Sequence, residues 1–306
     1  MGVNLLHYRQ WRGHFHGTWK SIWPIARTAL GMIFRRKLFW ALYALALLIF
    51  FMFFFGQYLL AWAVSQMSEE TIRVGGFSER PDRFINIIRD GLKINGSPTM
   101  YANFFWFQGY MVMTLLALAG SILVGNDFHF GSLPFYLAKP LSRWHYLAGK
   151  CLAVGVFVNL MTTLPAVVLF VQYGLLESWS YFTDSFRVFL GILGYGLLLT
   201  VCLSLFLVAT ASWLRRTVPM IMVWATCFVF FRLIATTLVD RLSYSPHWRL
   251  IDVWHDAYLV GGKLLGMPAQ STAQPPVFEA VLVLGVLSLI CLIYLNLRIR
   301  GVEVVR

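Results

Sequence analysis

Long apolar stretches, separated by shorter polar and basic segments, dominate the hydrophobic pattern of this 306-residue chain. A helix needs about 20 mostly apolar residues to cross the hydrocarbon core of a membrane. Backbone groups in lipid must also be satisfied within the helix, and the stretches lack the two-residue alternation of membrane-barrel strands. The pattern predicts six spanning helices, at about 38–65, 102–125, 151–176, 188–214, 217–239 and 277–297.

The segment before the first span has an amphipathic pattern. Its apolar residues recur at steps of three and four, and Lys20 and Arg27 fall on the other side of the predicted helix. A tryptophan-rich amphipathic helix favours the plane of the membrane interface. The helix either anchors residues 1–37 at the membrane surface or also touches a cytoplasmic partner. The apolar positions are Trp19, Ile22, Trp23, Ala26, Leu30 and Ile33.

Composition agrees with this pattern. Hydrophobic residues make up 59% of the chain and charged residues only 12%, with a mean hydropathy of +0.69, whereas soluble domains carry about 25% charged residues. We therefore expect an all-α integral membrane protein with six transmembrane helices. The formal charge of +12 is explained by basic flanks of membrane spans, so no nucleic-acid partner is predicted.

The distribution of Lys and Arg predicts the orientation. With the N-terminus inside, the inner segments hold fifteen of these residues and the outer segments hold eight. The short Arg215–Arg216 turn weighs most, because short loops follow the positive-inside rule best. The prediction is a multi-pass plasma-membrane protein with both termini cytoplasmic. Its parts are an arm (1–37), a six-helix domain (38–297) with a cytoplasmic loop (126–150), and a tail (298–306).

The spacing of the cysteines does not predict a metal or cofactor site. Cys151, Cys202, Cys227 and Cys291 all fall in or beside apolar runs, and none has the spacing of a metal ligand set. They are interpreted as small buried side chains. We also expect no cleavable signal peptide, because no short apolar segment with a small-residue cleavage site precedes the first span.

The largest inner loop carries an unusual group of residues. It contains "NDFHFGSLPFYLAKPLSRWHYLAGK", in which Gly131 permits a sharp change of direction. Pro140 suits the first turn of a short helix that would run to Lys150 with a basic and an aromatic side. Such a helix is either an interfacial turn with snorkelling cations or a surface that pushes against another protein.

The same loop resembles that of type-2 ABC transporter permeases. The resemblance rests on Asp127, Gly131-Ser132-Leu133, Tyr136, Lys139-Pro140-Leu141-Ser142-Arg143 and Gly149-Lys150, together with the arm and the six spans. The chain departs from the family at "DFHF", where many members have a charged Glu-Arg run. The resemblance implies that the loop couples the spans to a separate cytoplasmic ATPase. The implied coupling residues are Asp127, Gly131, Lys139, Pro140, Arg143 and Lys150.

The resemblance also implies how the protein is powered. ATP and Mg²⁺ would bind the partner ATPase, because this chain lacks a glycine-rich phosphate loop ending in Gly-Lys-Ser/Thr. The chain alone is then no enzyme. Six spans form half a pathway in that family, so a second copy or a homologous permease is expected. The implied function is that of the permease subunit of an exporter.

Charged residues near the outer side suggest further roles. Arg232 lies within the fifth span, where a charge is expensive and usually faces protein or water. Glu279 is its candidate partner, and Asp240 competes. Arg232 and Glu279 are therefore interpreted either as a pair that joins two helices or as pathway residues.

Two features of the spans predict their packing. The small residues of "GILGYG" predict close helix packing in the fourth span. Pro165 predicts a kink in the third span.

An outer cluster supports a competing function. Asp252, His255 and Asp256 lie close together in the sequence and have the side chains that acid–base chemistry or a metal needs. A membrane-embedded enzyme using this cluster is therefore one alternative. A non-transporting assembly or signalling protein that docks an ATPase is another.

Overall fold

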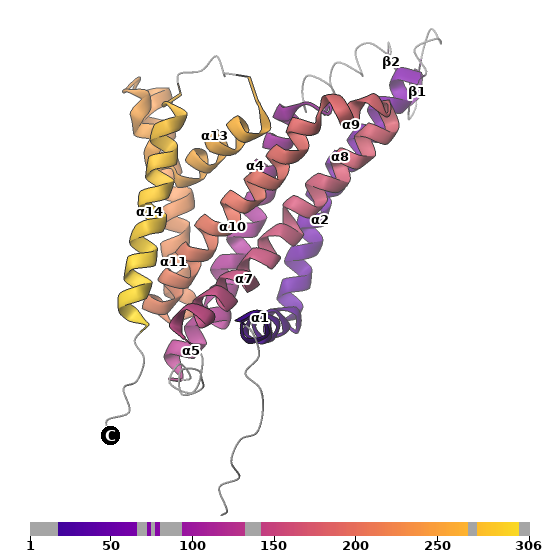
Figure 1. The fold of residues 1–306 in the computed structure, drawn as a ribbon. Coiled ribbons are helices and arrows are strands. Elements are labelled where there is room, and N and C mark those ends of the chain that lie inside the picture. The colour runs from indigo at the N-terminus through magenta and orange to yellow at the C-terminus, as the bar shows by residue number, and fades with distance from the viewer. Residues whose placement is uncertain are drawn as a thin grey trace, which may run out of the picture.

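A computed structural model gives the fold (Figure 1) and describes residues 18–65, 72–74, 77–79, 94–131, 142–268 and 274–299. Within these residues, six helices are long and apolar enough to cross a membrane: Lys37–Trp62, Pro98–Phe128, Arg143–Glu177, Phe186–Leu214, Thr217–Arg241 and Val277–Arg298. The predicted all-α class with six spans is confirmed. The described strands are short and form an antiparallel hairpin of β1 (Ile72–Val74) and β2 (Phe77–Glu79).

Several spans consist of more than one helical element. The first span lies within a single helix, α2 (Lys37–Ser65). The second span runs from α4 (Pro98–Gly120) into α5 (Asn126–His129). The third comprises α7 (Arg143–Met161) and α8 (Thr163–Glu177). The remaining elements are α9 (Ser180–Asp184), α10 (Phe186–Leu214), α11 (Thr217–Ala225), α12 (Phe231–Thr236), the 3₁₀ turn Pro246–Ile251, α13 (Val253–Leu265) and α14 (Val277–Arg298).

The N-terminal helix α1 (Thr18–Phe34) runs crosswise to the spans (Figure 1). Its buried face contains Ala26, Leu30 and Ile33 and packs against α7, whereas Trp19 and Trp23 are exposed. The predicted helix is therefore present, but its two tryptophans do not join the buried face. We call the end of the bundle with α1 and α5 the arm end, and the end with β1, β2, α9 and α13 the hairpin end.

The third span differs from its predicted form in two ways. It begins at Arg143 rather than near residue 151, so the expected coupling helix is not a separate element within the described residues. Basic and aromatic residues interrupt the apolar run there, but they do not interrupt the helix. The span also breaks at Thr162, three residues before Pro165. This agrees with the predicted kink, because proline lacks an N–H and crowds the carbonyl four residues earlier.

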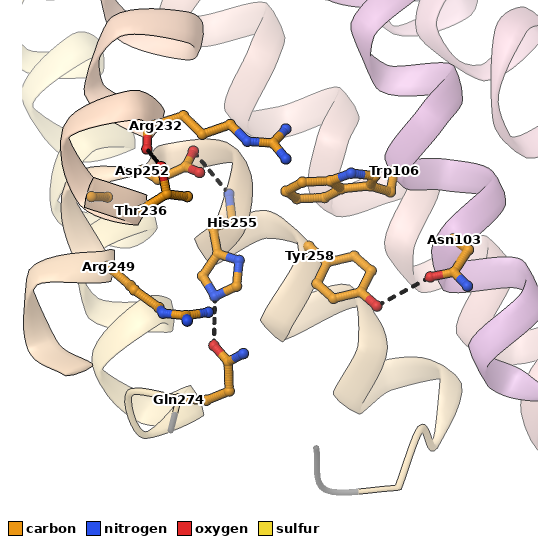
Figure 2. A pocket seen from close by; sticks show the side chains of 10 residues that line it. Asn103, Trp106, Arg232, Thr236, Arg249, Asp252, His255, Tyr258 and Gln274 are labelled. Carbon is orange, nitrogen blue, oxygen red and sulfur yellow. Dashed lines mark hydrogen bonds between the residues drawn. The ribbon is translucent and has the colours of Figure 1, made fainter. Parts of the chain in front are cut away.

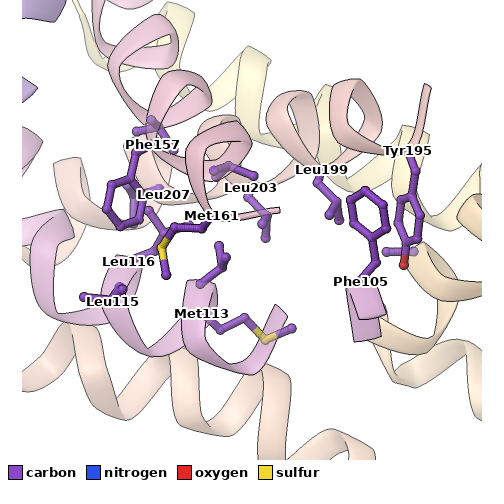
Figure 3. Close-up of a cluster of buried hydrophobic side chains, with 14 of the residues drawn as sticks. Phe105, Met113, Leu115, Leu116, Phe157, Met161, Tyr195, Leu199, Leu203 and Leu207 are labelled. Atoms are coloured by element: carbon purple, nitrogen blue, oxygen red, sulfur yellow. The ribbon is translucent and has the colours of Figure 1, made fainter. Parts of the chain in front are cut away.

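A continuous hydrophobic core joins α4, α7 and α10 (Figure 3). Phe105 and Tyr195 stack with ring centroids 4.4 Å apart. The close packing predicted for the fourth span is also present. At Gly191 a Cβ would lie 2.6 Å from the Leu265 Cα, so glycine allows α13 to rest against α10.

Within the described residues, three π-helical segments interrupt the spans. Ser121–Gly125 lies between α4 and α5, while Thr226–Phe230 and Thr237–Arg241 flank α12. A π-helical turn inserts an extra residue and rotates the helix that follows, and such turns are frequent at functional sites. Arg232 follows one of these segments closely and precedes another.

Candidate functional site

A buried ion pair closes the base of the predicted coupling loop. The Lys150 Nζ lies 2.7 Å from Asp127 Oδ2, and the Lys150 side chain is only 2% exposed. The Tyr146 hydroxyl donates to the same carboxylate oxygen at 2.8 Å, and Lys150 also donates to the Leu123 carbonyl. Two residues named for the loop motif therefore meet each other, and they join α5 to the first half of α7.

The neighbouring glycine of the motif positions α1. A Cβ on Gly149 would lie 2.8 Å from the Ile25 Cβ and 3.1 Å from the Ile22 carbonyl oxygen. Only a residue without a side chain lets α1 cross α7 at this distance. The Gly149-Lys150 pair thus fixes α7 to α1 and to α5 at the same level.

The start of α7 is capped by its own side chains. The Ser142 hydroxyl accepts from the His145 backbone N–H, and the His145 side chain accepts from the Ser142 backbone N–H in return. Arg143 is exposed at the first helical position, and its Nη1 donates to the Asn296 carbonyl at 3.4 Å. A cation at this place suits the last turn of α14, where carbonyl groups lack helical partners.

The remaining residues of the loop prediction are only partly described. Gly131 is exposed and has a φ of +66°, the backbone conformation that its predicted change of direction requires. Lys139 and Pro140 lie outside the described residues. The structure thus places Asp127 and Lys150 together, and it places Arg143 and Gly131 at the surface of the same end.

Further contacts at the arm end join span two to span five. A Cβ on Gly125 would lie 3.0 Å from the Arg215 carbonyl oxygen. Arg215 ends α10 in the left-handed conformation, with a φ of 55°. The Ser121 and Thr217 hydroxyls are 2.7 Å apart. The arm end is therefore closely packed and hydrogen-bonded.

The hairpin end contains a polar cavity of about 320 Å³ (Figure 2). Span two, span five, the 3₁₀ turn and α13 all contribute to its wall. This volume is within the range of small-molecule pockets. The lining residues are Asn103, Trp106, Arg232, Ala235, Thr236, Arg249, Asp252, His255, Tyr258 and Gln274.

Arg232 projects across this cavity toward an aromatic wall (Figure 2). Its guanidinium carbon lies 4.5 Å from the Trp106 ring centroid and 5.2 Å from that of Tyr110. Within the described residues, the guanidinium makes no hydrogen bond or ion pair. Ring faces attract a cation, but they do not satisfy its N–H donors.

Of the two interpretations of Arg232 and Glu279, the structure does not show the pair that would join two helices, because the two side chains do not contact each other. Glu279 Oε2 instead lies 2.7 Å from His247 Nδ1, at the start of α14. Asp240, the competing candidate, accepts from Arg249. The flexible Arg232 side chain turns toward aromatic rings of α4, and both acids find partners on the segment just before α13.

The Asp252, His255 and Asp256 cluster does not form one acid–base site. Asp252 Oδ1 caps α13 by accepting from the backbone N–H groups of Trp254 and His255. The His255 ring instead faces Gln274, with 2.7 Å between Nε2 and Oε1. Asp256 is fully buried and does not line the cavity, and both of its oxygens lack a partner in the described part of the chain.

Burial dominates the electrostatics of this cluster. It raises the pKa of Asp252 and lowers the pKa of His255. Burial, and secondarily the Asp252 carboxyl, raise the pKa of Asp256 to about 8. Among the described residues, no three His, Cys, Asp or Glu side chains could hold a metal ion. The three residues therefore have separate roles: Asp252 caps a helix, His255 is an uncharged residue of the cavity wall, and Asp256 is a buried acid.

Sequence reasoning missed most of the cavity. Arg232 was found because a charge within a span is conspicuous, but Trp106, Asn103 and Tyr258 are ordinary residues of apolar or mixed segments. Their convergence depends on how α4 packs against α13, and no local sequence pattern records this. One usable signal was the coincidence of Arg232 with the neighbouring outer Asp and His residues.

Comparison with known proteins does not add to this geometry: no protein-family model matches the chain, and a search of curated proteins finds no match.

Proposed function

We propose that the chain is the permease subunit of an ABC exporter in the plasma membrane, driven by a separate cytoplasmic ATPase that binds ATP and Mg²⁺. Support comes from the six apolar helices and from the resemblance of residues 126–150 to type-2 ABC permeases. A second copy of the chain, or a homologous permease, would complete the pathway.

The ion pair of Asp127 and Lys150 is the observation that carries the proposal. It connects the two helix ends that flank the loop, so a displacement of the loop would move α5 and α7 together. Because α1 packs on α7 at Gly149, it would follow. Rigid elements joined by hydrogen bonds and ion pairs can carry coupling between distant sites.

Purification with an ATPase tests the proposal. The tagged chain is co-expressed with its neighbouring genes, and ATP hydrolysis is measured in the purified membrane complex. We expect a stoichiometric ATPase that Arg143→Glu removes, since an anion would replace an exposed cation of the loop. Arg241→Glu, an exposed reversal at the hairpin end, is the matched control. A chain that purifies without an ATPase, or equal retention by both variants, would contradict the proposal.

The orientation has its own test. In a background without the four native cysteines, Ser142→Cys at the arm end should react only with reagent added on the cytoplasmic side. Ser245→Cys, an exposed position at the hairpin end, should react only from outside. The reverse labelling would place the loop on the wrong side for an ATPase.

A further inference from the structure

In the cavity at the hairpin end and directly beside it lie hydrogen-bond donors that have no acceptor among the described residues. The Arg232 guanidinium lies against two ring faces and makes no hydrogen bond or ion pair among the described residues. The Tyr110 hydroxyl and the Arg249 Nε are buried and have no hydrogen-bond partner among the described residues. A buried donor without a partner is destabilising, and the destabilisation is larger for a charged group. Within the described part of the chain these donors have no acceptor, so an oxyanion on a ligand would satisfy them.

The acidic residues nearby do not supply that acceptor. Asp252 Oδ1 is occupied by two backbone N–H groups of α13, and Asp240 is bound by Arg249. Burial lowers the pKa of His255, so the imidazole is uncharged at neutral pH. Asp252 also lines the cavity and acts on Arg232 through space, but among the described residues no carboxylate forms an ion pair or hydrogen bond with the Arg232 guanidinium.

A second cavity continues along the same two helices. It has a volume of about 200 Å³ and lies between α4 and the segment of span five before Arg232. Apart from Tyr110 and Thr114 its wall is apolar, and it includes Met113, Ala117, Leu118, Ile221, Trp224, Ala225, Phe228 and Val229. A chain in this cavity would be bounded by hydrophobic side chains along its whole length.

Arg232 and the two rings that it contacts lie between the two cavities. Of the two rings that contact its guanidinium, Trp106 lines the polar cavity and Tyr110 lines the apolar one. At the rim of the apolar cavity Thr114 is exposed, and Val229 is 52% exposed. Both residues belong to spans, so the rim opens on the membrane-spanning surface of the single chain. A ligand would therefore reach it sideways, from within the membrane.

We propose that the two cavities form one binding site for an anionic amphiphile, with its oxyanion at Arg232 and Tyr110 and its apolar chain between α4 and α11. Charge-assisted hydrogen bonds from arginine to phosphate or carboxylate are strong, and the apolar wall supplies burial for the chain. This inference names the substrate class of the proposed pathway and so rests on the proposed function. Its test needs neither ATP nor an ATPase, so the two can fail separately.

Native mass spectrometry of the chain purified in dodecyl maltoside tests the site. The probes are phosphatidylglycerol and phosphatidylcholine with identical acyl chains, together with dodecyl phosphate and inorganic phosphate. We expect phosphatidylglycerol or dodecyl phosphate to bind at one site per chain, about tenfold or more tighter than the phosphatidylcholine, because a hydrogen-bonded charge pair contributes this much. Inorganic phosphate should bind far more weakly.

Three variants assign the binding to these cavities. Arg232→Gln should remove the preference for the anion, while Arg241→Gln, an exposed arginine at the end of the same span, should keep it. Tyr110→Phe removes one donor without changing the ring, and Thr114→Trp obstructs the rim without touching Arg232. Tyr110→Phe and Thr114→Trp should each weaken binding of the preferred probe. These two variants test the site even if Arg232→Gln does not fold.

The outcomes separate the sources of the ligand. Tighter binding of phosphatidylglycerol than of dodecyl phosphate would identify a membrane lipid, and the reverse order would identify a single-chain amphiphile. Equal binding of phosphatidylglycerol and phosphatidylcholine, or binding unchanged in Arg232→Gln, would overturn the site. Equal binding of inorganic and dodecyl phosphate would overturn the role of the apolar cavity.

Discussion

The two ends of the bundle treat buried charge in opposite ways. At the arm end, Asp127 is held by Lys150 and Tyr146, and the remaining hydrogen bonds hold neighbouring helices. At the hairpin end, Arg232 faces aromatic rings, and Asp256 lacks any partner in the described structure. Paired buried charges hold elements in place, whereas unpaired ones leave a requirement that a ligand or a proton can meet.

The largest expected effect is at the arm end. Lys150→Met should lower the free energy of unfolding by about 3–5 kcal/mol, because it leaves the Asp127 carboxylate buried without its cation. The double variant Asp127→Asn/Lys150→Met should recover much of that loss. Reversible unfolding in SDS measures both, with Lys263→Met, an exposed lysine at the hairpin end, as control. Equal losses in Lys150→Met and Lys263→Met would mean that the pair stabilises little.

Asp256 should make stability depend on pH. Its folded-state pKa of about 8 is above the unfolded value of about 4, so between these values the folded chain keeps a proton that the unfolded chain has lost. This contribution is greatest below pH 4, falls as pH rises, and is constant above pH 8. At about 1.4 kcal/mol per pH unit, the loss between pH 5 and 7 is about 2–3 kcal/mol.

The difference between the wild type and Asp256→Asn isolates this contribution. Thermal unfolding in detergent, followed from pH 4 to pH 9, should show the wild type losing stability relative to the variant across the window. A difference that stays constant over the whole range would show that Asp256 ionises normally in the folded chain.

A smaller effect should distinguish two glycines in helices. At Gly149 a Cβ would meet Ile25, whereas at Gly285 it would meet nothing within 4 Å. Gly285→Ala should stabilise the chain by up to about 1 kcal/mol through helix propensity. Gly149→Ala should instead destabilise it by about 1 kcal/mol as α1 is displaced. The same SDS titration gives both values, and equal signs would argue against close packing of α1 on α7.

The smallest effect is expected at the unpaired arginine. Arg232→Leu should change the free energy of unfolding by less than about 1 kcal/mol in neutral detergent, because the lost ring contacts are offset by removal of a partly buried charge that has no ion-pair partner among the described residues. A loss as large as that of Lys150→Met would reveal a partner within the chain and remove the contrast between the two ends.

Hydropathy was sufficient to predict the number of spans, since a long apolar run has few alternatives to a membrane helix. It misplaced the start of the third span, because the polar residues between Arg143 and Lys150 continue the helix beyond the apolar run. The π-helical segments were not predicted. Their residues, such as "SILVG" and "TCFVF", are as apolar as those of the adjoining α-helices, and packing between helices decides their backbone geometry.

The candidate sites were predicted unevenly for a similar reason. Asp127 and Lys150 were both chosen from the loop motif, yet nothing in their spacing indicated that they bind each other. Arg232 was given candidate acidic partners because they were predicted to lie near the same side of the membrane, but its long side chain reaches rings of α4 instead. Which of several nearby groups a flexible cation meets depends on helix rotation, which the sequence does not specify locally.

The break at Thr162 divides the third span into two helical segments that can bend relative to each other. The first segment, α7, is joined to α1 and α5, and the second segment, α8, packs on α2 and α9. Pro165 supplies no N–H to bridge the joint, so bending there breaks no further hydrogen bond at that position. A push on the loop would therefore tilt α7 together with α1 and α5, while α8 stays in place on its own neighbours, so the movement would stop at the middle of the third span.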